Sequence, residues 1–157
     1  DIVSDIIDIP VKDNSFDVVI CTEVFEHLPE PLLAIKELNR ILKPKGELLL
    51  TVPNLCHYHQ EPYYFYSGFS EEFFNYAAKE YQMEVINIFK ESNFYEFLIL
   101  ELSLIRRYQK NKFKRLLIGL PVKLFVETLK IFKPLFEKKY FVLPKNYTGY
   151  YVRLRKK

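Results

Sequence analysis

Two apolar runs in the first third of the chain predict neighbouring strands of a parallel sheet. The run FDVVIC begins at Phe16, and the run ELLLTVP begins at Glu47. Neither run alternates between apolar and polar positions, which is typical of parallel strands that are covered on both faces. We therefore expect both strands to be buried. We also expect residues 1–5, DIVSD, to be the end of a preceding strand.

A helix is predicted between these two strands. Pro31 suits the first helical turn, and leucine and isoleucine then recur at helical spacing. Glu37 and Arg40 are expected on the solvent side of this helix. The segment KPKG at residues 43–46 ends it, because proline cannot continue a helix and glycine allows the chain to turn.

The remaining pattern alternates helices with strands. Ser70 is a good N-cap for a helix that runs to about Tyr81. The later elements are a strand MEVINIFKE, helical stretches at 94–110 and 113–138 that are interrupted near Gly119–Pro121, and a final strand in YTGYYVRLRKK. This order of elements indicates an open α/β sheet.

Reactive side chains collect just past the ends of the two parallel strands. Those after the first strand are Cys21, Thr22, Glu23, Glu26 and His27, and those after the second are Asn54, His57 and His59. In open α/β sheets, ligands bind outside the carboxyl ends of the strands. The sequence therefore predicts a site at this edge of the sheet.

These segments also carry a family resemblance. The stretch SDIIDIPVKDNSFDVVICTEVFEHLPEPLLAIKELNRILKPKGELLLTVPN resembles the middle of a class I S-adenosylmethionine-dependent methyltransferase, closest to the type 11 and ubiquinone-biosynthesis-like group. The resemblance implies an α/β, Rossmann-like seven-stranded methyltransferase fold with a helical insertion before the last strand. It is specific over residues 1–92, weak over 93–139 and moderate near the end.

The resemblance implies that the chain is organised in three parts. Residues 1–92 would be the C-terminal part of the α/β core, 93–139 a basic helical lid or insertion, and 140–157 the final antiparallel strand. The family's glycine-rich turn after its first strand has no counterpart, so we expect a fold truncated at the N-terminus by roughly 60–90 residues, or a degenerate one. The family's KPGG is KPKG here, with Lys45 in place of the first glycine.

The resemblance further implies roles for individual residues. Asp5 would accept a hydrogen bond from the adenine amino group of S-adenosylmethionine, and Ile6 would offer its backbone N–H to the ring. Cys21 and Thr22 would pass beside the methionine part of the cofactor. Glu23 would join them in the cofactor site.

The expected catalytic residues are His27, Glu26 and His57. Methyl transfer requires positioning of the acceptor, and it requires a base if the acceptor is a hydroxyl. Histidine is a natural base for that step.

Each of these features has a structural alternative. Asp5 could cap the next turn, and the Glu26–His27 pair could hold the turn between strand and helix. The CHYH segment at residues 56–59 could bind zinc, but a closed site needs three or four ligands, so we expect no metal centre. The aromatic cluster at residues 63–66 could stack on a flat acceptor or pack between helix and sheet. Cys21 is expected to be a small buried residue.

Acidic residues predominate in the first two thirds of the chain and basic residues in the last third. Residues 1–105 hold 7 Lys and Arg against 18 Asp and Glu, whereas residues 106–157 hold 16 against 2. Within 106–139, one helical face is expected to hold the apolar residues Val122, Phe125, Val126, Leu129 and Phe132. Another face is expected to hold Lys123, Glu127 and Lys130. This segment could be a lid over the substrate pocket, or an amphipathic helix on an anionic membrane. Nucleic acid is not expected as a partner, because no recognised reader motif accompanies the charge.

We therefore expect a class I methyltransferase that acts on a small molecule, at a hydroxyl or carbon of a metabolite, lipid precursor or glycan. Two unpaired cysteines fit a reducing, cytoplasmic location. The alternatives are a non-catalytic α/β binding module and a peripheral membrane protein that uses the basic helix.

Overall fold

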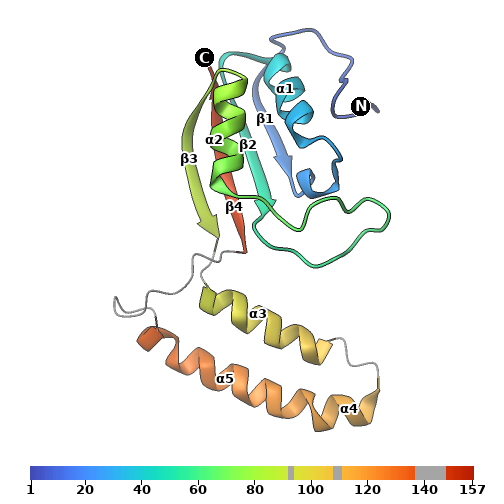
Figure 1. Ribbon diagram of the computed structural model, residues 1–157, viewed down its shortest axis with the longest axis vertical. Coiled ribbons are helices and arrows are strands. Elements are labelled where there is room, and N and C mark those ends of the chain that lie inside the picture. The colour runs from blue at the N-terminus through green and yellow to red at the C-terminus, as the bar shows by residue number, and fades with distance from the viewer. Residues whose placement is uncertain (92–93, 108–110, 137–147) are drawn as a thin grey trace. The chain divides into compact units, whose positions relative to one another are not determined.

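The computed structural model describes residues 1–91, 94–107, 111–136 and 148–157. The chain divides into two compact units (Figure 1). The sheet unit combines Asp1–Glu91 with Thr148–Lys157, and the helical unit lies between them in the sequence. The expected boundaries at 92–93 and 139–140 lie outside the described residues.

The sheet unit is built on a four-stranded sheet with the order β1-β2-β4-β3. Strands β1 (Phe16–Thr22) and β2 (Leu42–Pro53) are parallel. Strand β4 (Gly149–Lys156) runs antiparallel to both β2 and β3 (Met83–Glu91) and lies between them. The predicted α/β class and the final antiparallel strand are confirmed. Residues 1–5 form no strand, so that expectation is wrong for the described chain.

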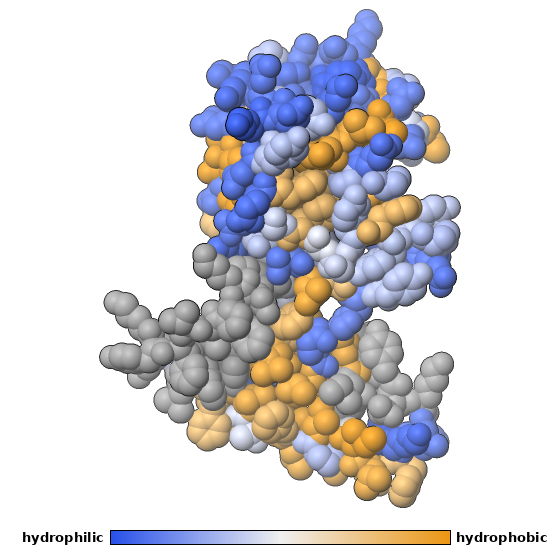
Figure 2. Space-filling model, viewed as in Figure 1, coloured by the Kyte–Doolittle hydropathy of each residue, from blue (hydrophilic) through white to orange (hydrophobic). Residues whose placement is uncertain are grey.

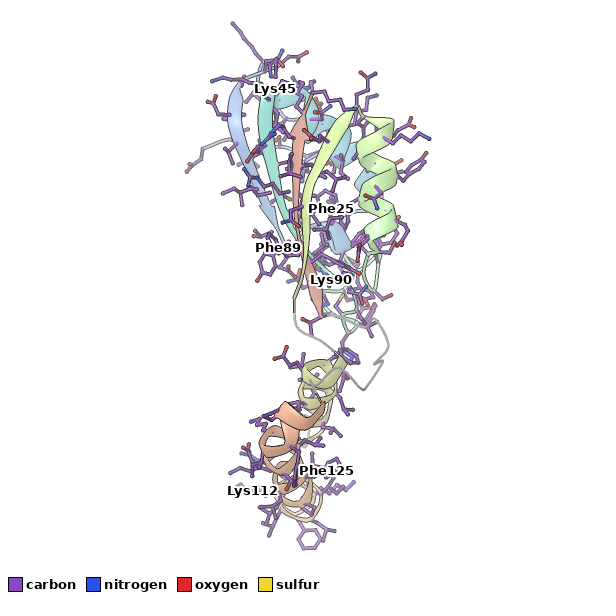
Figure 3. All side chains as sticks on the ribbon, turned by 90° about the vertical axis from the view of Figure 1, so that its left-hand side faces the viewer. Phe25, Lys45, Phe89, Lys90, Lys112 and Phe125 are labelled. Carbon is purple, nitrogen blue, oxygen red and sulfur yellow. The ribbon has the colours of Figure 1, made fainter. Side chains whose placement is uncertain are left out.

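Two helices cover one face of this sheet. Figures 1 and 3 place α1 (Pro31–Ile41) and α2 (Glu71–Glu80) on the same side of the strands. Ser70 caps α2 as predicted, since its hydroxyl accepts a hydrogen bond from the backbone N–H of Phe73 at 3.4 Å. A short 3-10 helix, η1 (Phe25–His27), follows β1.

The core lies between the helices and the sheet. Alternate residues of β2 and β4 are buried toward the helices, and Phe25 and Phe74 fill the space at 0% exposure. The largest fully buried apolar side chains are Phe25, Phe74, Ile35, Leu42, Leu48, Leu50, Leu154, Val52 and Val152. Burial at this edge of the core therefore fixes η1, the segment that carries Glu26 and His27.

The opposite face of the sheet is exposed, which corrects the prediction that β1 is covered on both faces. Val18 is 50% exposed and Ile20 is 68% exposed. Phe89 lies on this open side and Phe25 on the covered side (Figure 3). Burial of a second face requires a second layer, and α1 and α2 supply only one to the described sheet unit.

The prediction that Glu37 and Arg40 lie on the solvent side of their helix is also corrected. Glu37 is buried rather than solvent-facing, and its carboxylate accepts hydrogen bonds from the backbone N–H of Ile9 at 2.8 Å and from the Arg40 guanidinium at 2.7 Å. Arg40 also donates to the carbonyl oxygens of Ile9 and Val11. The hydrogen bond from Arg40 is the main reason that the pKa of Glu37 is lowered. The contribution of this pair to stability is therefore present above the ordinary carboxyl pKa and is lost as the pH falls through the lowered value.

Residues 43–46 belong to β2, at an irregularity in its register with β1, and correspond to the KPGG pattern of the resembled family. Lys45 adopts a φ of 66°, in the left-handed region. A Cβ atom on Gly46 would lie 2.8 Å from the carbonyl oxygen of Lys43 and 3.0 Å from that of Asp17. The retained glycine is required by close packing, whereas Lys45 carries backbone strain.

Replacing Lys45 with glycine is expected to stabilise the protein by about 0.5–1 kcal/mol. Relief of the left-handed strain, about 1–2 kcal/mol, exceeds the entropy that glycine adds to the unfolded chain. Urea unfolding would measure the change. Lys45→Ala removes the same exposed side chain but keeps the strain, so it should give no gain. Equal stabilisation by alanine would show that the effect comes from the lysine side chain.

The helical unit contains α3 (Phe94–Arg107), α4 (Lys112–Leu117) and α5 (Gly119–Phe136). The predicted interruption of the helical stretch is confirmed, because α4 ends before Ile118 and α5 begins at Gly119. Parts of the expected stretches, residues 108–110 and 137–138, lie outside the described residues. Among the described helices, none combines the length and apolar character needed to cross a bilayer.

Candidate functional site

The carboxyl ends of β1 and β2 meet, as the sequence predicts. Thr22 pairs with Thr51, and the backbone N–H of Glu23 donates to the carbonyl oxygen of Thr51 at 3.0 Å. Helix η1 follows β1, and a loop at residues 54–70 follows β2. The two reactive segments of the sequence are therefore neighbours.

The loop at residues 54–70 folds back over η1. The backbone N–H groups of Phe65 and Tyr66 both donate to the carbonyl oxygen of Glu26, at 2.9 and 3.2 Å. The Tyr66 hydroxyl donates to the carbonyl oxygen of Pro29 at 3.2 Å. Beneath them, Phe25 packs edge-on against Phe69. These contacts hold the loop against the turn that carries Glu26 and His27.

Three side chains converge at this junction. Glu26 is 2% exposed, and its Oε1 lies 3.6 Å from Nε2 of His27. The His59 ring contacts the His27 ring edge-on, with centroids 4.9 Å apart. One potential ligand atom from each of these three residues lies within 4.8 Å of the others. We call this group the Glu26–His27–His59 cluster.

Backbone carbonyls orient both imidazole rings of the cluster. Nδ1 of His27 contacts the carbonyl oxygen of Tyr63, and Nδ1 of His59 lies 2.7 Å from that of His57. A carbonyl oxygen only accepts, so each Nδ1 carries a hydrogen, and in a neutral ring Nε2 then carries the lone pair. In addition, Oε2 of Glu26 is buried and has no hydrogen-bond partner among the described residues. The cluster therefore brings possible acceptor atoms of three side chains close together.

Converging lone pairs of this kind can take up a proton or a divalent cation. A buried carboxylate with two imidazoles is a ligand set that divalent transition metals accept. This set differs from the CHYH combination considered from the sequence, because it uses His59 but neither Cys56 nor His57. The absence of a metal centre stays a prediction.

The structure separates the two histidines of the CHYH segment. His57 is exposed and is not in the cluster, whereas His59 is half-buried and faces His27. Of the three expected catalytic residues, Glu26 and His27 therefore lie together and His57 lies apart. His59 was in the set of strand-end residues, but its spacing could not distinguish it from His57.

Cys21 matches the expectation of a small buried residue. It is 8% exposed, and burial, with a further effect from the charge of Glu26, raises the pKa of its thiol to about 11. The thiol is thus protonated at neutral pH and a poor nucleophile. Thr22 and Glu23 are exposed, and Glu23 adopts a φ of 51°. At the end of β1, the polar side chains that a ligand could reach are therefore those of Thr22 and Glu23, which follow Cys21.

Asp5 makes the turn-capping contact that was considered as an alternative. Its Oδ1 accepts a hydrogen bond from the backbone N–H of Ile7 at 3.2 Å. The side chain is exposed, and Ile6 is half-buried. A carboxylate has acceptor positions for more than one donor, so this contact is compatible with a further hydrogen bond from an amino group. Contact with adenine stays a prediction.

The aromatic cluster at residues 63–66 does not pack between helix and sheet. Tyr63 is 65% exposed and Phe65 is 48% exposed. Tyr64 is half-buried, its hydroxyl donates to the carbonyl oxygen of Cys56 at 2.8 Å, and its ring contacts His59 edge-on. Tyr64 thus helps to position His59, and the exposed rings leave a surface on which a flat molecule could stack.

Comparison with known proteins found a family that matches the first third of the chain. Residues 1–50 match the family described as "Methyltransferase domain". An uncharacterized protein of Methanocaldococcus jannaschii is 47% identical over 53 residues, which cover 34% of this chain and 23% of that protein. The ubiquinone biosynthesis O-methyltransferase of Xanthomonas oryzae pv. oryzae is 48% identical over 43 residues, which cover 27% of this chain and 18% of that enzyme.

Solved structures share the fold. Phosphoethanolamine N-methyltransferase 2 of Haemonchus contortus, in complex with S-adenosyl-L-methionine, aligns with a TM-score of 0.54 at 17% identity, over 97% of this chain and 36% of that one. The [4+2]-cyclase SpnF aligns with a TM-score of 0.56 at 18% identity, over 98% of this chain and 55% of that one. The chain thus spans well under two thirds of these relatives. A cyclase among them shows that the fold does not settle the reaction.

Proposed function

We propose that this chain is part of a class I S-adenosylmethionine-dependent methyltransferase, and that the full-length protein transfers a methyl group to a small-molecule acceptor. The acceptor atom is a hydroxyl oxygen or a carbon of a metabolite, lipid precursor or glycan. The observation that carries this proposal is the position of the Glu26–His27–His59 cluster past the end of β1. Glu26 and His27 lie within residues 1–50, which match the family, and His59 lies beyond them.

The cofactor would be held by the residues that lead into β1 and out of it. Asp5 and Ile6 offer a carboxylate and a backbone N–H for the adenine. The backbone at Cys21 and the polar groups of Thr22 and Glu23 lie at the strand end, where the amino-acid part would pass. When bound, the cofactor supplies an electrophilic methyl group on a sulfonium.

His27 has the geometry of the base in this proposal. Its Nδ1–H is held by the carbonyl oxygen of Tyr63, so Nε2 carries the lone pair that accepts the proton of an attacking hydroxyl. During methyl transfer, Nε2 of His27 would hold the proton that the acceptor hydroxyl gives up. The resulting imidazolium is stabilised by Glu26, whose Oε1 lies 3.6 Å away.

Two measurements on the full-length protein test the proposal. Calorimetric titration with S-adenosylhomocysteine should show one site, and methyl-labelled cofactor should label a hydroxyl or carbon acceptor in a panel of metabolites. Absence of cofactor binding would overturn the proposal. Binding without transfer to any acceptor would favour the alternative of a non-catalytic binding module.

Replacing Asp5 with alanine is expected to weaken cofactor binding by about 10–100-fold, because a hydrogen bond to a charged group contributes about 1.5–3 kcal/mol. Calorimetric titration with S-adenosylhomocysteine would measure it. Asp8→Ala removes a nearby exposed carboxylate and should change the affinity by less than about threefold. Equal losses in both variants would indicate a general charge effect and would contradict the adenine contact.

A further inference from the structure

The helical unit has an apolar surface that stays exposed when its helices pack together. In α5, Val126 is 4% exposed and Val122 and Leu129 are half-buried, so one face of this helix is covered. These three residues recur at helical spacing, and α3 packs against α5. On the face shown in Figure 2, the coloured part of the helical unit is nevertheless largely hydrophobic, whereas the upper end of the sheet unit is largely hydrophilic.

The exposed residues form a second apolar face on α5, away from the covered one. We call it the outer face, and its large side chains are Leu120 (47% exposed), Leu124 (61%), Phe125 (55%), Ile131 (75%) and Phe132 (46%). At 100° per residue, they occupy a continuous sector that contains no charged residue. Helix α4 adds Phe113, Leu116 and Leu117, each at least 64% exposed. Exposed apolar patches of this kind mark interaction surfaces.

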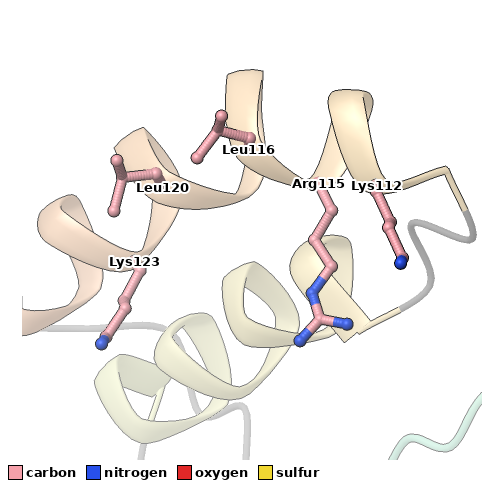
Figure 4. A pocket seen from close by; sticks show the side chains of 5 residues that line it. All are labelled: Lys112, Arg115, Leu116, Leu120 and Lys123. Carbon is pink, nitrogen blue, oxygen red and sulfur yellow. The ribbon is translucent and has the colours of Figure 1, made fainter.

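Positive charge flanks this surface. Residues 111–136 contain six Lys and Arg and a single acidic residue, Glu127. Lys112, Arg115 and Lys123 line a hollow of about 410 Å³ together with Leu116 and Leu120. Figure 4 shows these three cations extending in the same direction from α4 and the first turns of α5. The hollow thus combines three cations with two leucines.

We propose that α4 and α5 dock on the surface of an anionic phospholipid bilayer. The outer face would lie among the acyl chains near the headgroups, and Lys112, Arg115 and Lys123 would contact lipid phosphates. Leu, Ile and Phe on one face with Lys and Arg beside it is the composition of helices that lie in the membrane interface. None of the described helices needs to cross the bilayer for this mode of binding.

The charges favour a bilayer over the open face of the sheet as the occupant. That face is apolar at Ile20, Phe89 and Tyr151, but it also carries Arg153 and Arg155. Glu47 lies between these two arginines and accepts hydrogen bonds from both. An occupant that is both apolar and anionic matches the outer face and its cations, and an anionic bilayer has both properties.

Co-sedimentation of the full-length protein with vesicles tests this inference, which does not depend on methyl transfer. The protein should bind vesicles of phosphatidylcholine with phosphatidylglycerol and should bind phosphatidylcholine alone only weakly. Raising the salt from about 0.1 M to about 1 M should weaken the binding. Neutralising Lys112, Arg115 and Lys123 together with glutamine should reduce the partition coefficient about 100-fold, at about fivefold for each cation.

Matched variants separate surface docking from general effects. Replacing the exposed lysines Lys12, Lys36 and Lys79 of the sheet unit with glutamine changes the net charge equally and should reduce binding by less than about threefold. Leu124→Ser with Ile131→Ser should reduce binding at least about tenfold, whereas Leu33→Ser on α1 should not. The far-UV circular dichroism of each variant should match that of the parent protein.

Three results would overturn the inference. One is no binding to anionic vesicles, and another is equal loss of binding in the two charge variants. The third is a dimer in sedimentation velocity that Leu124→Ser with Ile131→Ser converts to a monomer, without any vesicle binding. That result would assign the outer face to a second copy of this chain.

Discussion

Replacing His27 with glutamine is expected to lower the turnover of the full-length protein on a hydroxyl acceptor by about 10²–10⁴-fold, the usual contribution of a general base. The hydrogen bond between Nδ1 of His27 and the carbonyl oxygen of Tyr63 leaves Nε2 as the basic atom. Glutamine is polar and of similar length, but it cannot take up the proton. Steady-state rates with methyl-labelled cofactor would measure the effect.

Cofactor binding should be almost unchanged in His27→Gln, within about threefold, because the proposed base would contact the acceptor rather than the adenosyl group. His57→Gln is the matched control, since His57 is exposed and outside the Glu26–His27–His59 cluster. Its turnover should remain within about threefold of the parent. An equal loss in both variants would reject the assignment of His27 as the base. Loss of cofactor binding in His27→Gln would place the pocket elsewhere.

Replacing Gly68 with alanine is expected to destabilise the protein by about 4 kcal/mol. Gly68 has a φ of 154°, and a Cβ atom there would lie 1.9 Å from the carbonyl oxygen of Asn54. The strained backbone costs about 2 kcal/mol and the clash with fixed backbone atoms about 2 kcal/mol more. The neighbouring hydrogen bonds, Cys56 N–H to Ser67 and Phe69 N–H to Pro53, must shift with the loop.

Urea unfolding would measure the stability of Gly68→Ala, and turnover should fall as well because the same loop positions His59 against His27. Ser67→Ala is the control, since Ser67 is exposed and uses its backbone carbonyl rather than its side chain. It should change the stability by less than about 0.5 kcal/mol. A similarly small change in Gly68→Ala would show that the loop can move away without loss.

Much of the secondary structure could be predicted from the sequence. The strand expected from Phe16 is β1, and the strand MEVINIFKE is β3 over Met83–Glu91. Ser70 caps α2, and the helical stretch breaks before Gly119. These features depend on neighbours within a few residues, such as apolar periodicity, a capping hydroxyl or a glycine. Local interactions of this kind are visible in the sequence.

Burial was predicted less well, because it depends on layers that the local pattern does not reveal. The apolar run of β1 indicated two covered faces, yet Val18 and Ile20 are exposed in the described sheet unit. Glu37 was expected in solvent, yet it is buried by bonds to Ile9, 28 residues away, and to Arg40. Apolar side chains of α5 were expected to share one face, but Phe125 and Phe132 belong to the exposed outer face.

The candidate site shows the same division. By itself, the sequence indicated a resemblance to a methyltransferase family, the α/β class and the edge of the sheet where Glu26 and His27 lie. The order of elements along the chain and the spacing of motifs can be read from local patterns. Only the tertiary structure distinguished His59 from His57 and assigned the lone pairs of the cluster. Those features require the 54–70 loop to fold back onto η1 through contacts such as Phe65 N–H to Glu26, which join residues 39 positions apart. Contacts between distant residues are determined by packing of the whole unit, so no local pattern encodes them.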